Sequence, residues 1–271
     1  MRLRLFLLIF FLTFSVSGCA GFVRFTQKRE LTKERREAVS LDALATPVLQ
    51  FSEGEKLEYD IRWMGMSVGT GRLEIQAIEP YEGRQVFHIV MRTESNWFLS
   101  SFYPVKDEIH TYIDTEKLIP YKFRKIQREG GYRADEEMRY DQENHKASYR
   151  SLLNNSSKEM EIPPAVQDSL STLYYFRTLP LEMGKSVFID VNADEKNWRL
   201  EIQVLKSGLL ALHGKEETPA FLVEPLAKFH GVFIRKGRMQ IWFSLDKRRI
   251  PLYMKANIPF GIVEVVLKKR L

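Results

Sequence analysis

One cysteine and five histidines are the residues of this 271-residue chain best suited to nucleophilic or metal chemistry. Cys19 is the only thiol, and once it is modified no disulfide can form, so folding must depend on packing. No two histidines have the spacing of metal ligands, and no second cysteine is available to join them. The histidines are therefore predicted to be ordinary strand or core residues without a bound metal: His88, His110, His145, His213 and His230.

Cys19 follows a segment that has the order of an export leader. Two arginines precede an apolar run over residues 5–14, and Val16-Ser17-Gly18 stands directly before the cysteine. The run is too short to span a bilayer permanently, so it predicts a secretory signal peptide. The Ser-Gly-Cys ending resembles the bacterial lipobox, in which the cysteine thiol is acylated and becomes the new N-terminus. Residues 1–18 are thus predicted to be a lipoprotein signal peptide and Cys19 the lipid attachment site; the alternative is an ordinary signal peptide with an incidental cysteine.

Acylation at Cys19 would tie the mature protein to a membrane. Each buried methylene contributes about 0.8 kcal/mol, so two or three acyl chains make an effectively permanent anchor. Ala20 follows the cysteine, which in a Gram-negative bacterium resembles the signal for the outer membrane. Residues 19–47 are polar and mixed in charge, and they predict a tether that lifts the domain off the membrane. A solvated linker without a binding role is equally compatible with this composition.

The net charge limits the partners that the protein can have. The formal charge is +6 for the whole chain and +4 after the leader is removed, because the leader contains two arginines and no acidic residue. This mild basic bias suits anionic lipid or polysaccharide. No block of lysine and arginine of the kind that binds nucleic acid is present, so nucleic acid is not an expected partner.

Acidic residues gather in two places, at Asp135-Glu136-Glu137 and at Asp190, Asp194 and Glu195. A glycosidase would need two such carboxylates to converge across a cleft. An outward strand face with its turn explains the first group, and a solvated turn explains the second. No Gly-x-Ser-x-Gly elbow is present either. The sequence therefore predicts no catalytic residues and no cofactor.

The segment from Trp97 to Pro104 has the most unusual composition in the chain, with four aromatic residues in eight positions. One interpretation is an aromatic lip over a pocket or a face that meets lipid, because exposed aromatic clusters mark contact sites. The other is a connection that crosses the core, which is favoured because large aromatic residues are more often buried. The candidate ligand-binding residues are Trp97, Phe98, Phe102 and Tyr103. A second apolar stretch, Leu209-Leu210-Ala211-Leu212, allows the same two interpretations.

Most of the chain after Phe51 alternates between apolar and polar residues. Leu57, Tyr59, Ile61 and Trp63 alternate with charged residues, which predicts a half-buried strand. The glycines that follow predict a hairpin with a bulged or wide turn. Further strands are predicted over residues 73–77, 86–93, 108–113, 120–126, 132–140, 145–152, 187–191, 198–205, 220–223, 232–234, 239–243, 252–256 and 262–267.

One segment breaks this rhythm. Asp168 can cap a helix, and Leu170, Leu173 and Tyr174 have helical spacing before Pro180 stops it. We predict a helix over residues 168–179 that packs these three side chains onto one face of a sheet. Many evenly spaced strands with one central helix predict a mainly β domain over residues 48–271, built as a single curled antiparallel sheet or a partly closed barrel. A division near residues 155–165 is the alternative.

Five motifs are spread along the chain: Gly54-Glu55-Lys56-Leu57-Glu58-Tyr59 with Trp63, Asp168 to Arg177, Gly237 to Ser244, Pro251-Leu252 and Ile258 to Gly261. Together they resemble the bacterial family known as domain of unknown function 3108. The resemblance covers residues 51–267. It implies an exported, β-rich protein of the cell envelope, and it implies no catalytic residues.

Three functions are compatible with these features. The first is a non-enzymatic envelope lipoprotein, expected at the outer membrane facing the periplasm, whose curled sheet binds a lipid, a lipoprotein or a surface polysaccharide. The second is a structural or assembly partner that uses an exposed sheet edge. The third is a glycan or lipid hydrolase, for which no motif is found. An apolar cavity wide enough for an acyl chain would favour the first over the second.

Overall fold

The computed structural model describes residues 24–26, 51–212, 216–229, 232–233 and 239–271. The predicted leader, Cys19 and most of the predicted tether lie outside these residues, as do His213 and His230. Among the described residues no helix has the length and hydropathy needed to cross a bilayer.

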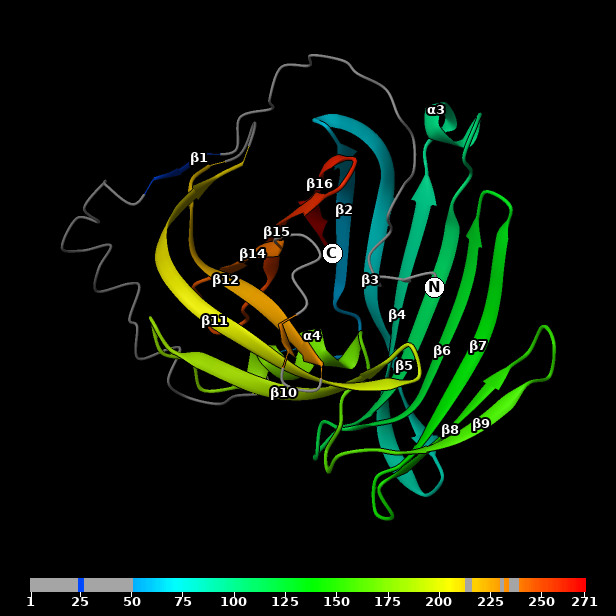
Figure 1. Cartoon of the computed structure of the whole chain (residues 1–271). Coiled ribbons are helices and arrows are strands. Elements are labelled where there is room, and N and C mark those ends of the chain that lie inside the picture. Colours follow the sequence, from blue (N-terminus) through cyan, green and yellow to red (C-terminus); the bar gives the residue numbers. More distant parts are fainter. Residues whose placement is uncertain (1–23, 27–50, 213–215, 230–231, 234–238) are drawn as a thin grey trace.

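Strands dominate the described chain, as the alternating sequence predicts (Figure 1). The first half contains β1 (Arg24–Thr26), β2 (Lys56–Trp63), β3 (Met66–Tyr81), β4 (Arg84–Ser95), β5 (Lys106–Asp114), β6 (Pro120–Glu129), β7 (Tyr132–Asp141), β8 (Lys146–Ser151) and β9 (Ser157–Glu161). The second half contains β10 (Ser186–Ala193), β11 (Lys196–Ala211), β12 (Thr218–Phe229), β13 (Val232–Phe233), β14 (Met239–Ser244), β15 (Pro251–Ile258) and β16 (Gly261–Arg270). Two helices complete the described elements: α3 (Trp97–Ser100) and α4 (Ser171–Thr178).

All these strands belong to one antiparallel sheet that curls without closing, which confirms the predicted fold class. Its order is β1-β11-β12-β14-β15-β16-β2-β3-β4-β5-β6-β7-β8-β9, with β10 beside β11 and β13 beside β12. Neighbouring strands are mostly joined by short hairpins. The β2–β3 hairpin turns at Met64 and Gly65, whose φ angles of 51° and 84° explain why a glycine is placed there.

The main chains at the open edges of the sheet meet at a single residue. After β9 the chain crosses toward β10, where Gln167 N–H donates to Asp190 O at 2.8 Å and Asn192 N–H donates to Gln167 O at 2.7 Å. This contact is an isolated parallel bridge between Gln167 and Val191. The main-chain hydrogen bonds across the gap are therefore confined to one residue and do not form a ladder, and we call this main-chain contact the seam. Side-chain contacts lie beside it, among them the hydrogen bond of 2.7 Å from Asn197 Nδ2–H to Glu161 O.

The interior of the curled sheet is filled by apolar side chains. One buried cluster combines residues from strands on both sides of the curl, including Leu57, Phe87, Leu222 and Trp242, with Tyr174 of α4. A second cluster forms where β10, β11, β12 and β14 pack on the other face of α4. The apolar stretch at 209–212 contributes to this interior, since Leu209, Leu210 and Leu212 are all buried.

The predicted helix is present as α4, three residues shorter at its start than expected. Asp168 caps it: its Oδ1 accepts the backbone N–H groups of Leu170 and Ser171, both at 2.7 Å. Thr111 of β5 donates its hydroxyl to the other carboxylate oxygen at 2.5 Å. Leu170 and Tyr174 are buried in the first core cluster and Leu173 packs against it. The cap and the packing face agree with the prediction.

A buried ion pair fixes α4 to the start of the sheet. Arg177 is fully enclosed and holds Glu55 by two hydrogen bonds of 2.7 and 2.8 Å. Its guanidinium also lies 5.1 Å from the ring centroid of Phe51 and 5.0 Å from that of Tyr174. Burial lowers the pKa of Arg177, but the hydrogen bonds and charge of Glu55 outweigh this effect, so the pKa of Arg177 is raised and its guanidinium stays charged.

Candidate functional site

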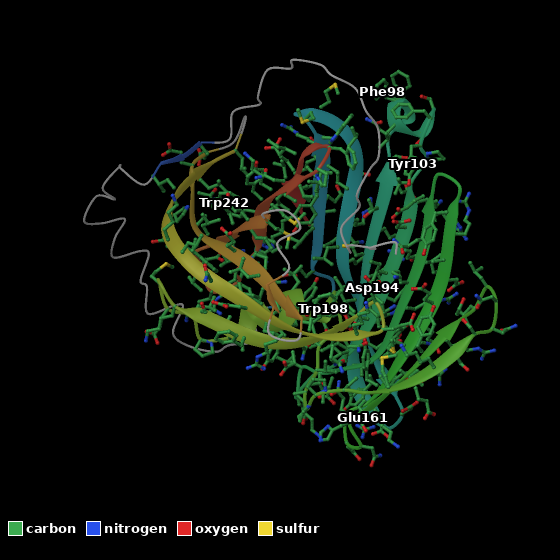
Figure 2. The ribbon with its side chains drawn as sticks, in the orientation of Figure 1. Phe98, Tyr103, Glu161, Asp194, Trp198 and Trp242 are labelled. Atoms are coloured by element: carbon green, nitrogen blue, oxygen red, sulfur yellow. The ribbon has the colours of Figure 1, made fainter. Side chains whose placement is uncertain are left out.

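The aromatic segment between β4 and β5 forms a projection at one end of the sheet. Asn96 begins α3 and its Oδ1 accepts the backbone N–H of Leu99 at 3.0 Å, which closes a single helical turn. Leu99 is buried beneath this turn, whereas Trp97 is 82% exposed, Phe98 45% and Phe102 46%. We call Trp97, Phe98 and Phe102 the aromatic tip; Figure 2 shows Phe98 there, far from Trp242 in the interior.

The favoured interpretation of this segment as a connection that crosses the core is wrong. A single turn can bury only one of its faces, and Leu99 occupies it. The three aromatic rings instead contact one another edge to face, with centroids 6.0 Å apart for Trp97–Phe98 and 5.5 Å apart for Phe98–Phe102. Such contacts order the rings but leave most of their area in water. The exposed-lip interpretation therefore describes the geometry, and the role of these residues in binding stays a prediction.

Tyr103 is half-buried and differs from the three residues of the tip. Its ring packs against Gly130 in the β6–β7 turn, where an added Cβ would lie 2.8 Å from the ring. Behind it, burial raises the pKa of Glu129 to about 7, assisted by a hydrogen bond to Asp107 and by the charge of that carboxylate. Tyr103 therefore anchors the base of the tip beside a carboxyl group, that of Glu129, whose pKa is raised into the neutral range.

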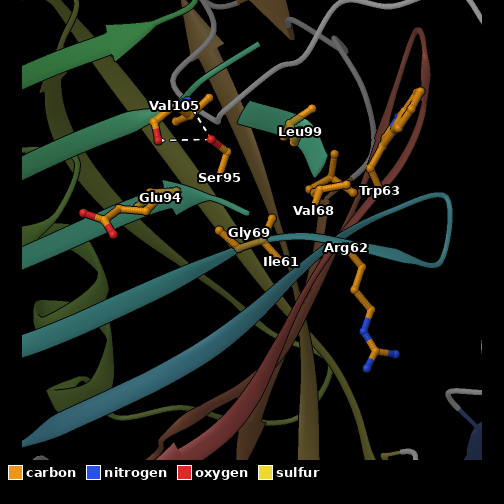
Figure 3. A pocket seen from close by; sticks show the side chains of 11 residues that line it. Ile61, Arg62, Trp63, Val68, Gly69, Glu94, Ser95, Leu99 and Val105 are labelled. Atoms are coloured by element: carbon orange, nitrogen blue, oxygen red, sulfur yellow. Dashed lines mark hydrogen bonds between the residues drawn. The ribbon is translucent and has the colours of Figure 1, made fainter. Parts of the chain in front are cut away.

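A small pocket lies at the base of the aromatic tip (Figure 3). It is bordered by apolar side chains, among them Ile61, Val68, Leu99 and Val105. Gly69 lines it where β3 approaches β4 so closely that a Cβ would lie 2.5 Å from Glu94 O. The pocket has a volume of about 30 Å³. This is room for two or three water molecules, since each requires about 10–15 Å³ on this measure. An acyl chain does not fit inside it.

Two histidines form a pair that the sequence did not indicate. The β4–β5 register sets His88 opposite Tyr112 and Val90 opposite His110, so the two imidazoles are diagonal neighbours with Nε2 and Nδ1 2.9 Å apart. Burial lowers the pKa of both, that of His110 to about 4. No group of three or more metal-binding side chains occurs in the described part of the chain. The pair is thus a hydrogen-bonded contact; only the register, which spacing along the chain does not reveal, could have predicted it.

The two acidic groups are engaged in ion pairs. Glu136 lies 2.9 Å and Asp194 3.8 Å from the buried amine of Lys125, so one residue from each group meets at the same cation. Asp135 is held by Arg124 through two hydrogen bonds of 3.0 Å, and Asp190 pairs with Arg199. Carboxylates that are paired in this way act as structural charges and are poorly placed to exchange protons with a substrate.

Comparison with known proteins identifies a family and a fold. The family model described as "Protein of unknown function (DUF3108)" matches residues 58–268. A beta-barrel-like protein of the domain of unknown function DUF1849 from Brucella abortus superposes with a TM-score of 0.52 at 10% identity, over 80% of this chain and 97% of that one. A Bacteroides fragilis protein with a YmcC-like fold gives a TM-score of 0.32 at 9% identity, over 83% and 99%. No curated protein sequence matches the chain.

Proposed function

This chain belongs to the DUF3108 family of proteins of unknown function, and we propose that it is a non-enzymatic lipoprotein of the cell envelope that contacts lipid through the aromatic tip. Cys19 would carry the acyl chains and hold the domain at a membrane. The proposed location is the outer membrane, on the side that faces the periplasm. The observation that carries the proposal is the exposure of Trp97, Phe98 and Phe102 together on one projection. Aromatic residues gathered in water at one point favour a contact with apolar material.

A surface contact fits the geometry better than a contained ligand. The pocket at the base of the tip has room for only two or three water molecules, and apolar side chains pack together inside the curled sheet. Amphiphile binding is therefore assigned to the projecting side chains and not to an enclosed cavity.

The alternative function, assembly through a sheet edge, has less support. Three of the five residues of the edge strand β9 are charged, namely Lys158, Glu159 and Glu161, a pattern that discourages pairing with another chain. The edge at β10 is partly occupied by Gln167. The hydrolase alternative has no support, since the acidic groups are held in ion pairs.

We expect the double substitution Trp97→Ala and Phe102→Ala to weaken lipid contact at least tenfold while leaving the fold intact. Removing two exposed rings deletes contact area with lipid, at about 25 cal/mol per Å² of apolar surface, but removes little from the core. Co-sedimentation of a chain beginning at residue 20 with phosphatidylethanolamine–phosphatidylglycerol vesicles measures the contact, and thermal unfolding checks the fold. The control is Phe188→Ala with Leu205→Ala, which truncates two exposed apolar residues on β10 and β11. An equal loss of sedimentation in both variants would contradict the proposal.

The anchor is tested separately in cells. Cys19→Ala should abolish labelling by a palmitate analogue and leave the leader uncleaved by the lipoprotein pathway. Ser17→Ala serves as the control. It keeps a small residue two positions before Cys19, so the protein should still be labelled. Labelling is measured by gel electrophoresis and fluorography. Labelling that persists in Cys19→Ala would show that the acyl chain is attached elsewhere, and would contradict the anchor at Cys19.

A further inference from the structure

Two arginines face each other at the end of the β6–β7 hairpin. Arg128 and Arg133 are direct cross-strand partners, so their side chains share one face, and both are exposed. Like charges in such positions destabilise an antiparallel pair. Neither guanidinium forms an ion pair within the part of the chain that the structure describes. This arrangement concentrates positive charge at a point where the fold itself does not neutralise it.

The nearby carboxylates form no ion pair with these arginines in the described part of the chain. Asp107 uses Oδ1 to accept the backbone N–H of Arg128 at 2.8 Å. Burial, assisted by Asp107, raises the pKa of Glu129 to about 7. Arg133 donates Nη1–H to the carbonyl oxygens of Gly130 and Tyr132, both at 2.8 Å, which positions its guanidinium against the turn. A planar guanidinium held in this way can still offer its other N–H groups to a phosphate or carboxylate.

The arginine pair adjoins the aromatic tip. Gly130 N–H donates to Pro104 O at 2.8 Å, and Val105 and Glu129 form an isolated bridge, so the hairpin end is bonded to the chain that leaves the tip. Figure 1 shows the β6–β7 hairpin ending just below α3. Cationic and aromatic side chains therefore lie at the same end of the sheet.

Further apolar side chains extend this end on the opposite side of α3. Met64 and Met66 at the β2–β3 turn are both exposed. The turn is tied to α3 through Asn96, which donates its backbone N–H to Val68 O at 2.9 Å and its Nδ2–H to Ser67 O at 2.7 Å. The aromatic tip is thus bordered by methionines on one side and by arginines on the other.

The geometry points to an anionic phospholipid bilayer as the partner of this end of the molecule. The aromatic tip enters the boundary between headgroups and acyl chains, while Arg128 and Arg133 bind lipid phosphates. Aromatic rings prefer that boundary, and arginine keeps its charged end at the headgroups. This inference rests on the proposed function and adds the lipid class and the residues that recognise it. The projecting shape suits a bilayer, which receives a wedge, whereas a single bound lipid would need a groove.

Vesicle affinity tests the inference with the chain that begins at residue 20, which contains every described residue. The unsubstituted chain should bind phosphatidylglycerol vesicles at least tenfold more tightly than phosphatidylcholine vesicles in 0.1 M salt. Arg128→Gln with Arg133→Gln should lower the affinity for phosphatidylglycerol about 30-fold, because each cation near an anionic surface contributes about a factor of five. The affinity for phosphatidylcholine should stay unchanged in this variant.

The matched control removes the same charge at the other end of the same strands. Lys117 is exposed in the β5–β6 turn and Lys146 at the start of β8, and Lys117→Gln with Lys146→Gln should reduce the affinity less than threefold. An equal loss of affinity in both double variants would show that only the net charge of the protein matters, and this would overturn the inference. The inference would also be overturned if the unsubstituted protein bound both lipids equally. If that binding were lost on substitution of Trp97, the proposed function would still stand. Binding to dextran sulfate without binding to vesicles would identify a polysaccharide partner and contradict both.

Discussion

Replacing Arg177 by methionine is expected to lower the free energy of unfolding by about 3–5 kcal/mol. Methionine has a similar length but leaves the buried carboxylate of Glu55 without its two hydrogen bonds of 2.7 and 2.8 Å. An uncompensated buried charge is strongly unfavourable, whereas a paired one is roughly neutral relative to an apolar replacement. Urea denaturation at pH 7, followed by circular dichroism, measures the change. The loss would be a large part of the 5–15 kcal/mol that is typical of a domain.

The matched variant separates the ion pair from general packing. Glu55→Gln combined with Arg177→Met removes both charges, so the double variant should be more stable than the sum of the single changes predicts, by about 1–3 kcal/mol. Strict additivity would show that the two residues do not act as a pair. A loss below about 1 kcal/mol in Arg177→Met alone would show that the enclosed guanidinium contributes little.

Replacing Asp168 by asparagine is expected to remove a pH-dependent loss of stability. Burial raises the pKa of Asp168 from 3.8 to about 6, although hydrogen bonds from Thr111, Ser171 and Leu170 oppose the shift. The folded state therefore binds this proton more tightly than the unfolded chain does. The resulting stabilisation is complete below pH 3.8, and it is lost as the pH rises through 6. The loss amounts to about 3 kcal/mol, because each pKa unit corresponds to about 1.4 kcal/mol.

The asparagine amide can cap the helix as aspartate does, but it does not ionise. Asp168→Asn therefore changes the pH dependence of stability while leaving the cap in place. Its amide oxygen can still accept the N–H groups of Leu170 and Ser171, and asparagine is as good an N-cap as aspartate. From pH 4 to pH 7 the native chain should thus lose about 3 kcal/mol of stability relative to the variant. Guanidinium denaturation curves of both proteins across this range provide the comparison. Parallel curves at every pH would contradict the raised pKa.

The strands and α4 could be predicted because the spacing of apolar residues within each segment indicates which of its faces is buried. Alternation in Leu57, Tyr59 and Ile61 places one face of β2 inward whatever its partner is, and Leu170 with Tyr174 does the same for a helix. The capping role of Asp168 was also predictable, because an N-cap acts within a few residues of itself. These features gave the correct fold class without any knowledge of strand order.

Features that depend on distant parts of the chain were not predictable from spacing. Glu55 and Arg177 are 122 positions apart, and nothing near either residue indicates the other. The His88–His110 contact depends on the β4–β5 register in the same way. The exposure of Trp97 contradicted the favoured interpretation because large aromatic residues are usually buried and only the capped turn at Asn96 turns it outward.

The arginine pair depends on the exact register of the β6–β7 hairpin. Residues 129–131 predict a turn, and a three-residue turn there would set residue 128 opposite residue 132. The hairpin instead turns at Gly130 and Gly131, with Glu129 opposite Tyr132, and so places Arg128 opposite Arg133. What the sequence did not indicate was the hydrogen bond from Gly130 to Pro104, which brings this hairpin to the aromatic tip. The candidate site was therefore predictable in its parts and not in its assembly.

The main-chain hydrogen bonds at the seam are few compared with those between neighbouring strands. Parting β10 from the incoming chain breaks two main-chain hydrogen bonds, whereas β8 and β9 pair over five residues each. Amides of Gln167 and Asn192 should accordingly exchange with deuterium before those of the neighbouring strands. Opening the curl would also require side-chain contacts to break, such as the one from Asn197 to Glu161, but it would leave every strand ladder intact, which a continuous barrel does not allow.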